Sequence, residues 1–147
     1  NGLATELWDM ILGQGKRVWG VANDDAHLNP KKRYYSDSGR GWVEVWTETL
    51  SRDEILNALK RGAFYSTQGP KFTSIVVEES TIRIACTPVA QVRWRTFGHV
   101  GFVHHAPEEG ELTQSALPEW FTPRLFVRIE LVDHRGKKAW SNPFFVA

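Results

Sequence analysis

Apolar residues recur at helical spacing at the start of the chain and again after residue 50. Those at positions 3, 7, 10 and 11 predict a helix over residues 3–13, with two glycines placed to end it. The segment Ser51-Arg52-Asp53-Glu54 has a capping-box pattern, and Gly62 provides a C-terminal stop. A second helix is therefore expected over about residues 52–61.

Short apolar runs lie between these two helices. Residues 18–22 are apolar and bounded by polar residues on both sides, which is typical of a strand buried on both faces. Residues 28–41 read as a long loop, and residues 42–46 return to strand character. The order helix, strand, loop, strand, helix is typical of α/β folds.

After Gly69-Pro70 the pattern changes to alternation. Apolar residues occupy every second position over 82–86, 92–95 and 125–131, as in strands with one packed face. The stretch 106–123 reads as a long loop. Such strands, joined by turns, predict a small all-β sandwich over residues 71–147, with the boundary near Pro70.

The charge balance and the cysteine count limit the kinds of partner and cross-link that the chain can have. Lys and Arg total 18 against 17 Asp and Glu, so a net charge of +1 gives no field that would recruit nucleic acid or an anionic membrane. Cys86 is the single cysteine, which excludes a disulfide or a thiolate cluster within one chain. No apolar run has the length of a bilayer span, no targeting segment is visible, and the cellular compartment stays open. The first residue is Asn rather than Met, which suggests a processed product or a fragment.

The concentrated chemical signal is Asp25-Ala26-His27, directly after the first apolar run. In extended backbone, residues two apart point to the same side, so one carboxylate and one imidazole can reach a single cation. Zn, Mn and Fe all suit that pair of ligands. On spacing alone, a surface Asp and His near a turn is the alternative, and a turn or cap role is expected for Asp24.

A longer pattern surrounds this pair. The run from Arg17 to His27 resembles the last metal-binding motif of the PHP (polymerase and histidinol phosphatase) family. So do the segments 41–45, 58–62 and 64–70, and residues 139–143 (Ala-Trp-Ser-Asn-Pro) are similar to the last strand of a β-sandwich that follows in some members. The resemblance covers nearly the whole chain.

The resemblance implies a fold and an activity. Residues 1–70 would be the C-terminal segment of a PHP-type distorted β/α barrel, followed by the β-sandwich as a structural or regulatory domain. The parent protein would hydrolyse a phosphate-ester small molecule with two or three divalent ions. Asp25 and His27 would be metal ligands, with His27 bound as neutral imidazole and its other ring nitrogen held by an acceptor.

The sequence also departs from the family pattern. The family opens with a His-x-His motif, and no histidine precedes His27 here. A lone Asp and His would hold an ion weakly, so we expect the chain by itself to be inactive as a phosphoesterase and to hold no metal tightly.

Two further clusters of charged and histidine residues are weaker candidates for a functional site. Lys31, Lys32 and Arg33 follow the metal pair and are candidates to meet a substrate phosphate, against the alternative of a solvated loop. His104 and His105 precede three glutamates, but adjacent strand residues face opposite sides, which favours a surface cluster over joint chelation.

The alternative function comes from a different class. Seven Trp and eight Phe are compatible with a β-sandwich that binds sugars or other partners without catalysis, although most of them fall on core positions. Residues 1–70 cannot complete a barrel alone, so we expect them to pack on the sandwich or to pair with another copy, which makes a homo-oligomer plausible.

Overall fold

The computed structural model describes residues 4–27, 38–78, 81–98 and 101–146. Within these ranges it contains two helices and ten strands. The elements are α1 (Thr5–Gly13), β1 (Trp42–Val45), α2 (Arg52–Arg61), β2 (Phe64–Thr67), β3 (Phe72–Val77), β4 (Ile82–Val89), β5 (Gln91–Arg95), β6 (Gly101–His105), β7 (Leu112–Ala116), β8 (Phe126–Val132), β9 (Lys138–Ser141) and β10 (Phe144–Phe145).

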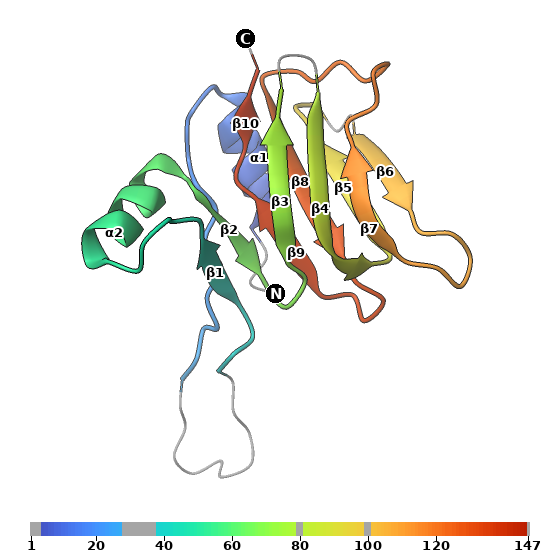
Figure 1. Cartoon of the computed structure of the whole chain (residues 1–147). Coiled ribbons are helices and arrows are strands. Elements are labelled where there is room, and N and C mark those ends of the chain that lie inside the picture. Colours follow the sequence, from blue (N-terminus) through green and yellow to red (C-terminus); the bar gives the residue numbers. More distant parts are fainter. Residues whose placement is uncertain (1–3, 28–37, 79–80, 99–100, 147) are drawn as a thin grey trace.

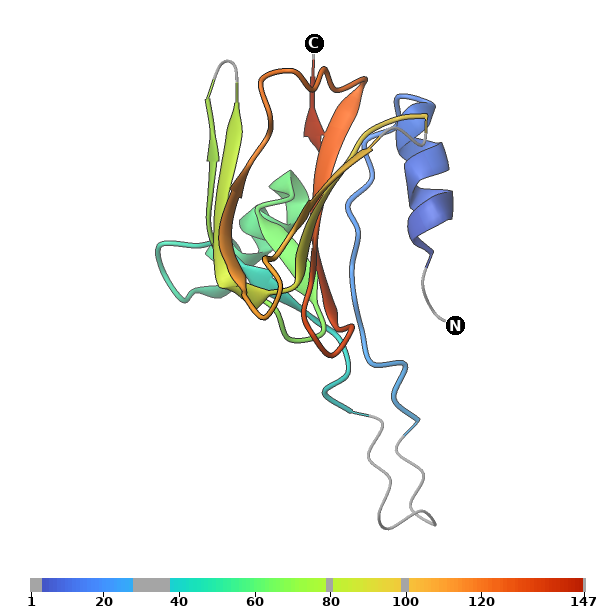
Figure 2. The same cartoon turned by 90° about the vertical axis from the view of Figure 1, so that its right-hand side faces the viewer.

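The strands form two sheets that pack face to face (Figures 1 and 2). The larger sheet has the order β1-β2-β9-β8-β5-β6, with β10 paired to β8, and the smaller has the order β3-β4-β7. Helix α1 lies on the outer face of the larger sheet, as Figure 2 shows. The described residues therefore form a β-sandwich with a helix as a third layer on one side.

Alternation along the strands builds the core between the sheets. Ile82 and Ile84 on β4 belong to the same core cluster as Val92 and Trp94 on β5, and all four are buried. The indole Nε1 of Trp94 donates to Ser115 Oγ at 3.1 Å, so this large ring is buried with its polar atom paired. The alternating strands expected over 82–86, 92–95 and 125–131 are present as β4, β5 and β8.

The expected α/β barrel segment over residues 1–70 is wrong. Barrel strands are parallel and joined by crossover helices, whereas β1 pairs with β2 in antiparallel register although α2 lies between them. Strand β2 then pairs with β9, again antiparallel. The order of elements resembled that of an α/β fold, but the strand partners place β1 and β2 at one edge of the larger antiparallel sheet.

Local signals gave the helices correctly. The helix expected over 3–13 is α1, and the helix expected over 52–61 is α2. Ser51 Oγ accepts from the Glu54 N–H at 3.2 Å, and Gly62 ends the helix in the left-handed conformation. Two other expectations are wrong: residues 18–22 form no strand, and the long loop expected over 106–123 contains β7.

Strands from both sides of Pro70 belong to one sheet, because Tyr65 on β2 is opposite Ser141 on β9. Strand β2 is thus a member of this sheet, rather than part of a barrel remnant packed on it. Pairing with another copy of the chain stays a prediction.

A buried charge network fixes α1 to the larger sheet. The guanidinium of Arg128 donates to both carboxylate oxygens of Asp9 on α1 and to Glu130 on its own strand, each at 2.5 Å. Burial opposes the charge on Arg128, but the hydrogen bonds and charges of Asp9 and Glu130 outweigh it, so the pKa of Arg128 is raised. The ring of Trp8 also faces this guanidinium, 5.3 Å from its carbon.

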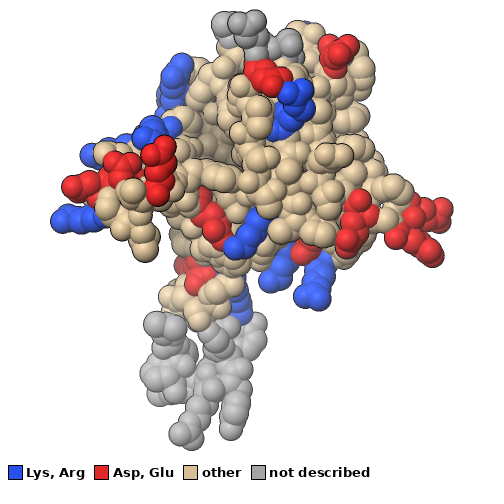
Figure 3. Space-filling view, viewed as in Figure 1, with Lys and Arg blue, Asp and Glu red and all other residues tan. Residues whose placement is uncertain are grey.

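Charges on the face seen in Figure 3 lie mainly around its rim, with acidic and basic side chains intermixed. This distribution agrees with the net charge of +1 and gives that face no continuous patch of one sign. Among the described residues, neither helix has the length and apolar character needed to cross a membrane.

Candidate functional site

A groove of about 910 Å³ lies between α1 and the larger sheet. The extended segment 18–27 lines it, together with residues of α1, β2 and β9. Asp25 and His27 are among the lining residues, so the ligand pair expected from sequence borders the groove. In Figure 2 the end of this segment lies at the same end of the molecule as the start of α1.

Side chains hold the extended segment in place. The Gly20 N–H donates to Asn142 Oδ1 at 2.9 Å, and the Gly20 carbonyl accepts from Ser66 Oγ at 2.9 Å. Trp8 Nε1 donates to the Val18 carbonyl at 2.9 Å. Within the described residues, no backbone–backbone hydrogen bond involves residues 16–27. The run is extended, as its apolar character indicates, but it lacks the neighbouring strand that a ladder requires.

Asp24 connects the extended segment to residues 39–41. Its carboxylate accepts three backbone N–H groups, from Gly39 at 2.7 Å, Arg40 at 2.6 Å and Gly41 at 2.8 Å. The hydrogen bonds from Gly41 and Gly39 hold the pKa of Asp24 below its ordinary value of 3.8. The capping role expected for Asp24 thus has a specific form: the residue fixes the turn from which Asp25 and His27 project.

The lowered pKa of Asp24 predicts that its hydrogen bonds to residues 39–41 are lost in acid. Because the folded pKa is lowered, the stabilisation by Asp24 is fully present above pH 3.8 and is lost as the pH falls through the lower folded value. In nuclear magnetic resonance spectra, the amide protons of Gly39, Arg40 and Gly41 should shift together with a midpoint below pH 3.8. The variant Asp24→Asn should lack this common transition, and a midpoint at or above 3.8 would contradict the assignment.

A tight turn, rather than strand alternation, sets the positions of Asp25 and His27. Asp25 has a φ of 50°, a left-handed conformation that Asp tolerates, and its N–H donates to Asn23 Oδ1 at 2.9 Å. His27 Nδ1 lies 2.6 Å from the Asp25 carbonyl oxygen. A carbonyl can only accept, so Nδ1 carries the proton and the lone pair of the neutral ring is on Nε2. Both side chains are exposed.

This geometry suits a metal ligand in one respect. Histidines that bind metals through one nitrogen usually donate the other N–H to a backbone carbonyl or a carboxylate. The Asp25 carbonyl is the acceptor that the sequence left unidentified. Asp25 and His27 are nevertheless only two groups, and the described residues contain no cluster of three or more His, Cys, Asp or Glu able to hold a metal ion.

The other sequence candidates separate into two cases. Lys31, Lys32 and Arg33 lie outside the described residues. His104 and His105 occupy successive positions on β6, opposite Val92 and Gln91 of β5, and His104 Nδ1 lies 3.3 Å from Ser115 Oγ. Successive strand positions face opposite sides of the sheet, as the surface-cluster interpretation requires.

Trp140 is a buried residue of the groove that the sequence did not indicate as part of a site. Trp140 lines the groove and is 6% exposed, and its Nε1 is the one buried side-chain polar atom without a hydrogen-bond partner among the described residues. An unpaired buried donor costs about 1–3 kcal/mol of stability. The sequence indicated residues 139–143 only as a strand, through the family resemblance, and nothing local connected that strand to residue 20.

No protein-family model, curated protein or solved structure matches the chain. The resemblance to the PHP family therefore stays a prediction from the residues.

Proposed function

We propose that Asp25 and His27 are one ligand pair of a divalent metal centre in a phosphoesterase, and that its remaining ligands come from polypeptide other than the described residues. The observation that carries this proposal is the contact between His27 Nδ1 and the Asp25 carbonyl, because it puts the lone pair of the neutral ring on Nε2. The adjoining groove offers space for a phosphate ester.

The chain's own residues would have three roles in such a site. Asp25 offers a carboxylate oxygen and His27 an imidazole nitrogen, a ligand set that suits Zn, Mn or Fe. Asp24 fixes the turn that carries both, through the backbone of residues 39–41. When bound, divalent ions polarise the phosphoryl oxygen and lower the pKa of a coordinated water.

The ligand role is tested by Mn²⁺ titration of the chain. Paramagnetic Mn²⁺ should broaden the His27 ring signals before those of His134, which lies in an exposed turn. His27→Ala should weaken Mn²⁺ binding by about tenfold or more, since loss of a supporting residue alone costs 10–100-fold at metal sites. His134→Ala is the matched control. Equal affinity in the two variants would contradict the proposal and favour a binding module that works without metal.

Catalysis needs a separate test. The chain alone should show no metal-dependent hydrolysis of p-nitrophenyl phosphate, because two ligands hold an ion weakly. The natural gene product should hydrolyse it with Mn²⁺ or Zn²⁺, and Asp25→Ala should abolish that turnover. The intact mass of this product is the first measurement to make. A product of only 16.8 kDa would remove the catalytic proposal, because no further ligands would exist.

A further inference from the structure

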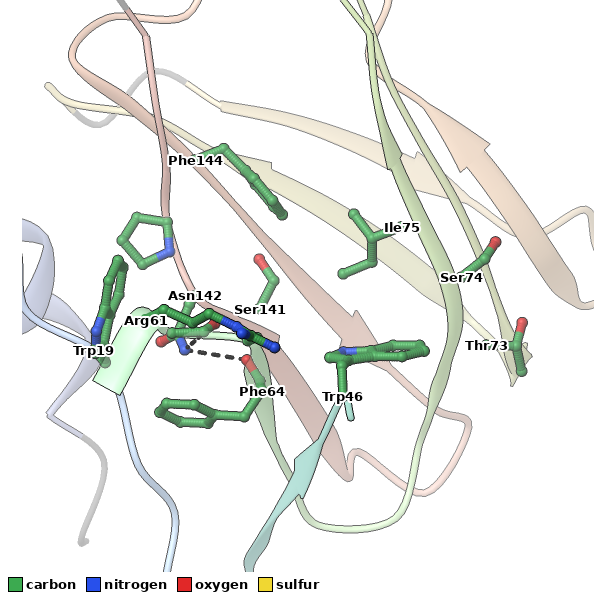
Figure 4. Close-up of a pocket in the computed structure, with 13 residues that line it drawn as sticks. Trp19, Trp46, Arg61, Phe64, Thr73, Ser74, Ile75, Ser141, Asn142 and Phe144 are labelled. Carbon is green, nitrogen blue, oxygen red and sulfur yellow. Dashed lines mark hydrogen bonds between the residues drawn. The ribbon is translucent and has the colours of Figure 1, made fainter. Parts of the chain in front are cut away.

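A second hollow, which the metal site does not use, lies between the end of α2 and the edge strand β3 (Figure 4). Its volume is about 420 Å³, within the range of pockets that bind small molecules. Its walls include the rings of Trp19, Trp46, Phe64 and Phe144. Such a concentration of aromatic rings around one cavity offers flat apolar surfaces to a ligand ring.

The walls of this pocket are fixed before any ligand arrives. Trp19 Nε1 donates to the Lys60 carbonyl at 3.1 Å, and its ring packs closely over Gly62, where an added Cβ would lie 2.7 Å from the indole. The ring of Trp46 packs against that of Tyr65, with 6.0 Å between centroids. Asn142 donates to the Gly62 and Phe64 carbonyls, each at 3.1 Å, as the dashed lines in Figure 4 show. Little ordering would remain to oppose binding.

Arg61 is the one charged residue that lines the pocket. Its side chain extends across the pocket in Figure 4, in the direction of Trp46. No Asp or Glu lines this cavity, and no carboxylate of the described residues forms an ion pair with Arg61. The alternative role of Arg61 is to compensate the negative end of α2, but that role would be filled equally by its neighbour Lys60.

We propose that this pocket binds a small aromatic carboxylate. The ring would pack among Trp19, Trp46 and Phe64, and the carboxylate would accept two N–H groups from Arg61. A phosphate monoester fits less well, because it carries about −1.5 to −2 charges and the pocket offers a single cation. The hydroxyl of Ser74 on β3 is available for a polar substituent at the opposite wall.

The proposal is tested by ¹⁹F nuclear magnetic resonance with 4-fluorophenylacetate as the probe and its neutral amide as the comparison. The acid should bind at least about tenfold more tightly than the amide, because a hydrogen-bonded charge pair is worth more than a neutral contact. Arg61→Gln should remove this preference. Lys60→Gln is the matched control, since it deletes the same charge from an exposed neighbour that does not line the pocket.

The outcomes separate this site from the metal site. His27→Ala should leave acid binding unchanged, whereas its loss in that variant would place the acid in the groove beside α1 and overturn the assignment. Equal binding of acid and amide, equal losses in Arg61→Gln and Lys60→Gln, or no binding of the acid would each also overturn it. The test needs no added metal, so it succeeds or fails independently of the phosphoesterase proposal.

Discussion

Replacing Arg128 by Met is expected to lower the free energy of unfolding by about 3–5 kcal/mol, the range found when one member of a buried ion pair is removed. The side chain of Arg128 is 2% exposed and that of its partner Glu130 is 5% exposed. Without Arg128, the Glu130 carboxylate would stay buried, with Arg93 and Arg95 no closer than 4.0 Å. Asp9 would also lose its partner, and α1 its main polar attachment to the sheet.

Urea unfolding measures this effect, and two further variants define its cause. Arg83→Met removes an exposed ion pair with Glu78 and should cost no more than about 1 kcal/mol. The double variant Arg128→Met/Glu130→Gln should be more stable than Arg128→Met, because no uncompensated buried charge remains. If Arg128→Met cost no more than Arg83→Met, the network would not attach α1 as described.

Replacing Asn142 by Leu is expected to cost about 3 kcal/mol or more, since three backbone groups would lose their partners at about 1–3 kcal/mol each when buried. These groups are the Gly20 N–H and the carbonyls of Gly62 and Phe64. Asn142 is 7% exposed, so water reaches it poorly. One amide thus connects the extended segment of the groove to the end of α2 and the start of β2.

The Asn142→Leu variant can be compared with Asn57→Leu on the exposed face of α2, which should change stability by less than about 0.5 kcal/mol. Amide hydrogen exchange gives a second, local measurement. The Gly20 N–H should exchange faster in Asn142→Leu than in the Asn57 variant, because it loses its acceptor. Unchanged protection at Gly20 would show that another group holds the segment.

Much of the local structure could be predicted from sequence because its causes are local. The capping residues Ser51 and Gly62 set the ends of α2 within one turn of the residues that they serve. Alternation gave β4, β5 and β8, since the pleat places every second residue on the core face. Asp25 and His27 could be named in advance only as candidate ligands, and the left-handed turn at Asp25, not an extended strand, positions the pair.

The fold predicted from sequence was wrong where it depends on which strands are neighbours in a sheet. The order of elements in residues 1–70 resembled α/β material, but nothing local distinguishes a strand with parallel neighbours from one that joins an antiparallel edge. Residues 18–22 show the same difficulty, because an apolar run predicts extended backbone and not the presence of a partner. The stretch 106–123 looked like a loop since β7 exposes three of its five residues, which hides the alternation.

By itself, the sequence determined helix ends, the face of each alternating strand and the candidate ligands, because these depend on residues within a few positions of one another. The tertiary structure decided what those elements contact. Asp9 reaches Arg128 across 119 positions, and Gly20 reaches Asn142 across 122. Such pairs form only once the sheets are assembled, so no local periodicity encodes them. The groove beside Asp25 and His27 and the aromatic pocket beside Arg61 both arise from contacts of this kind.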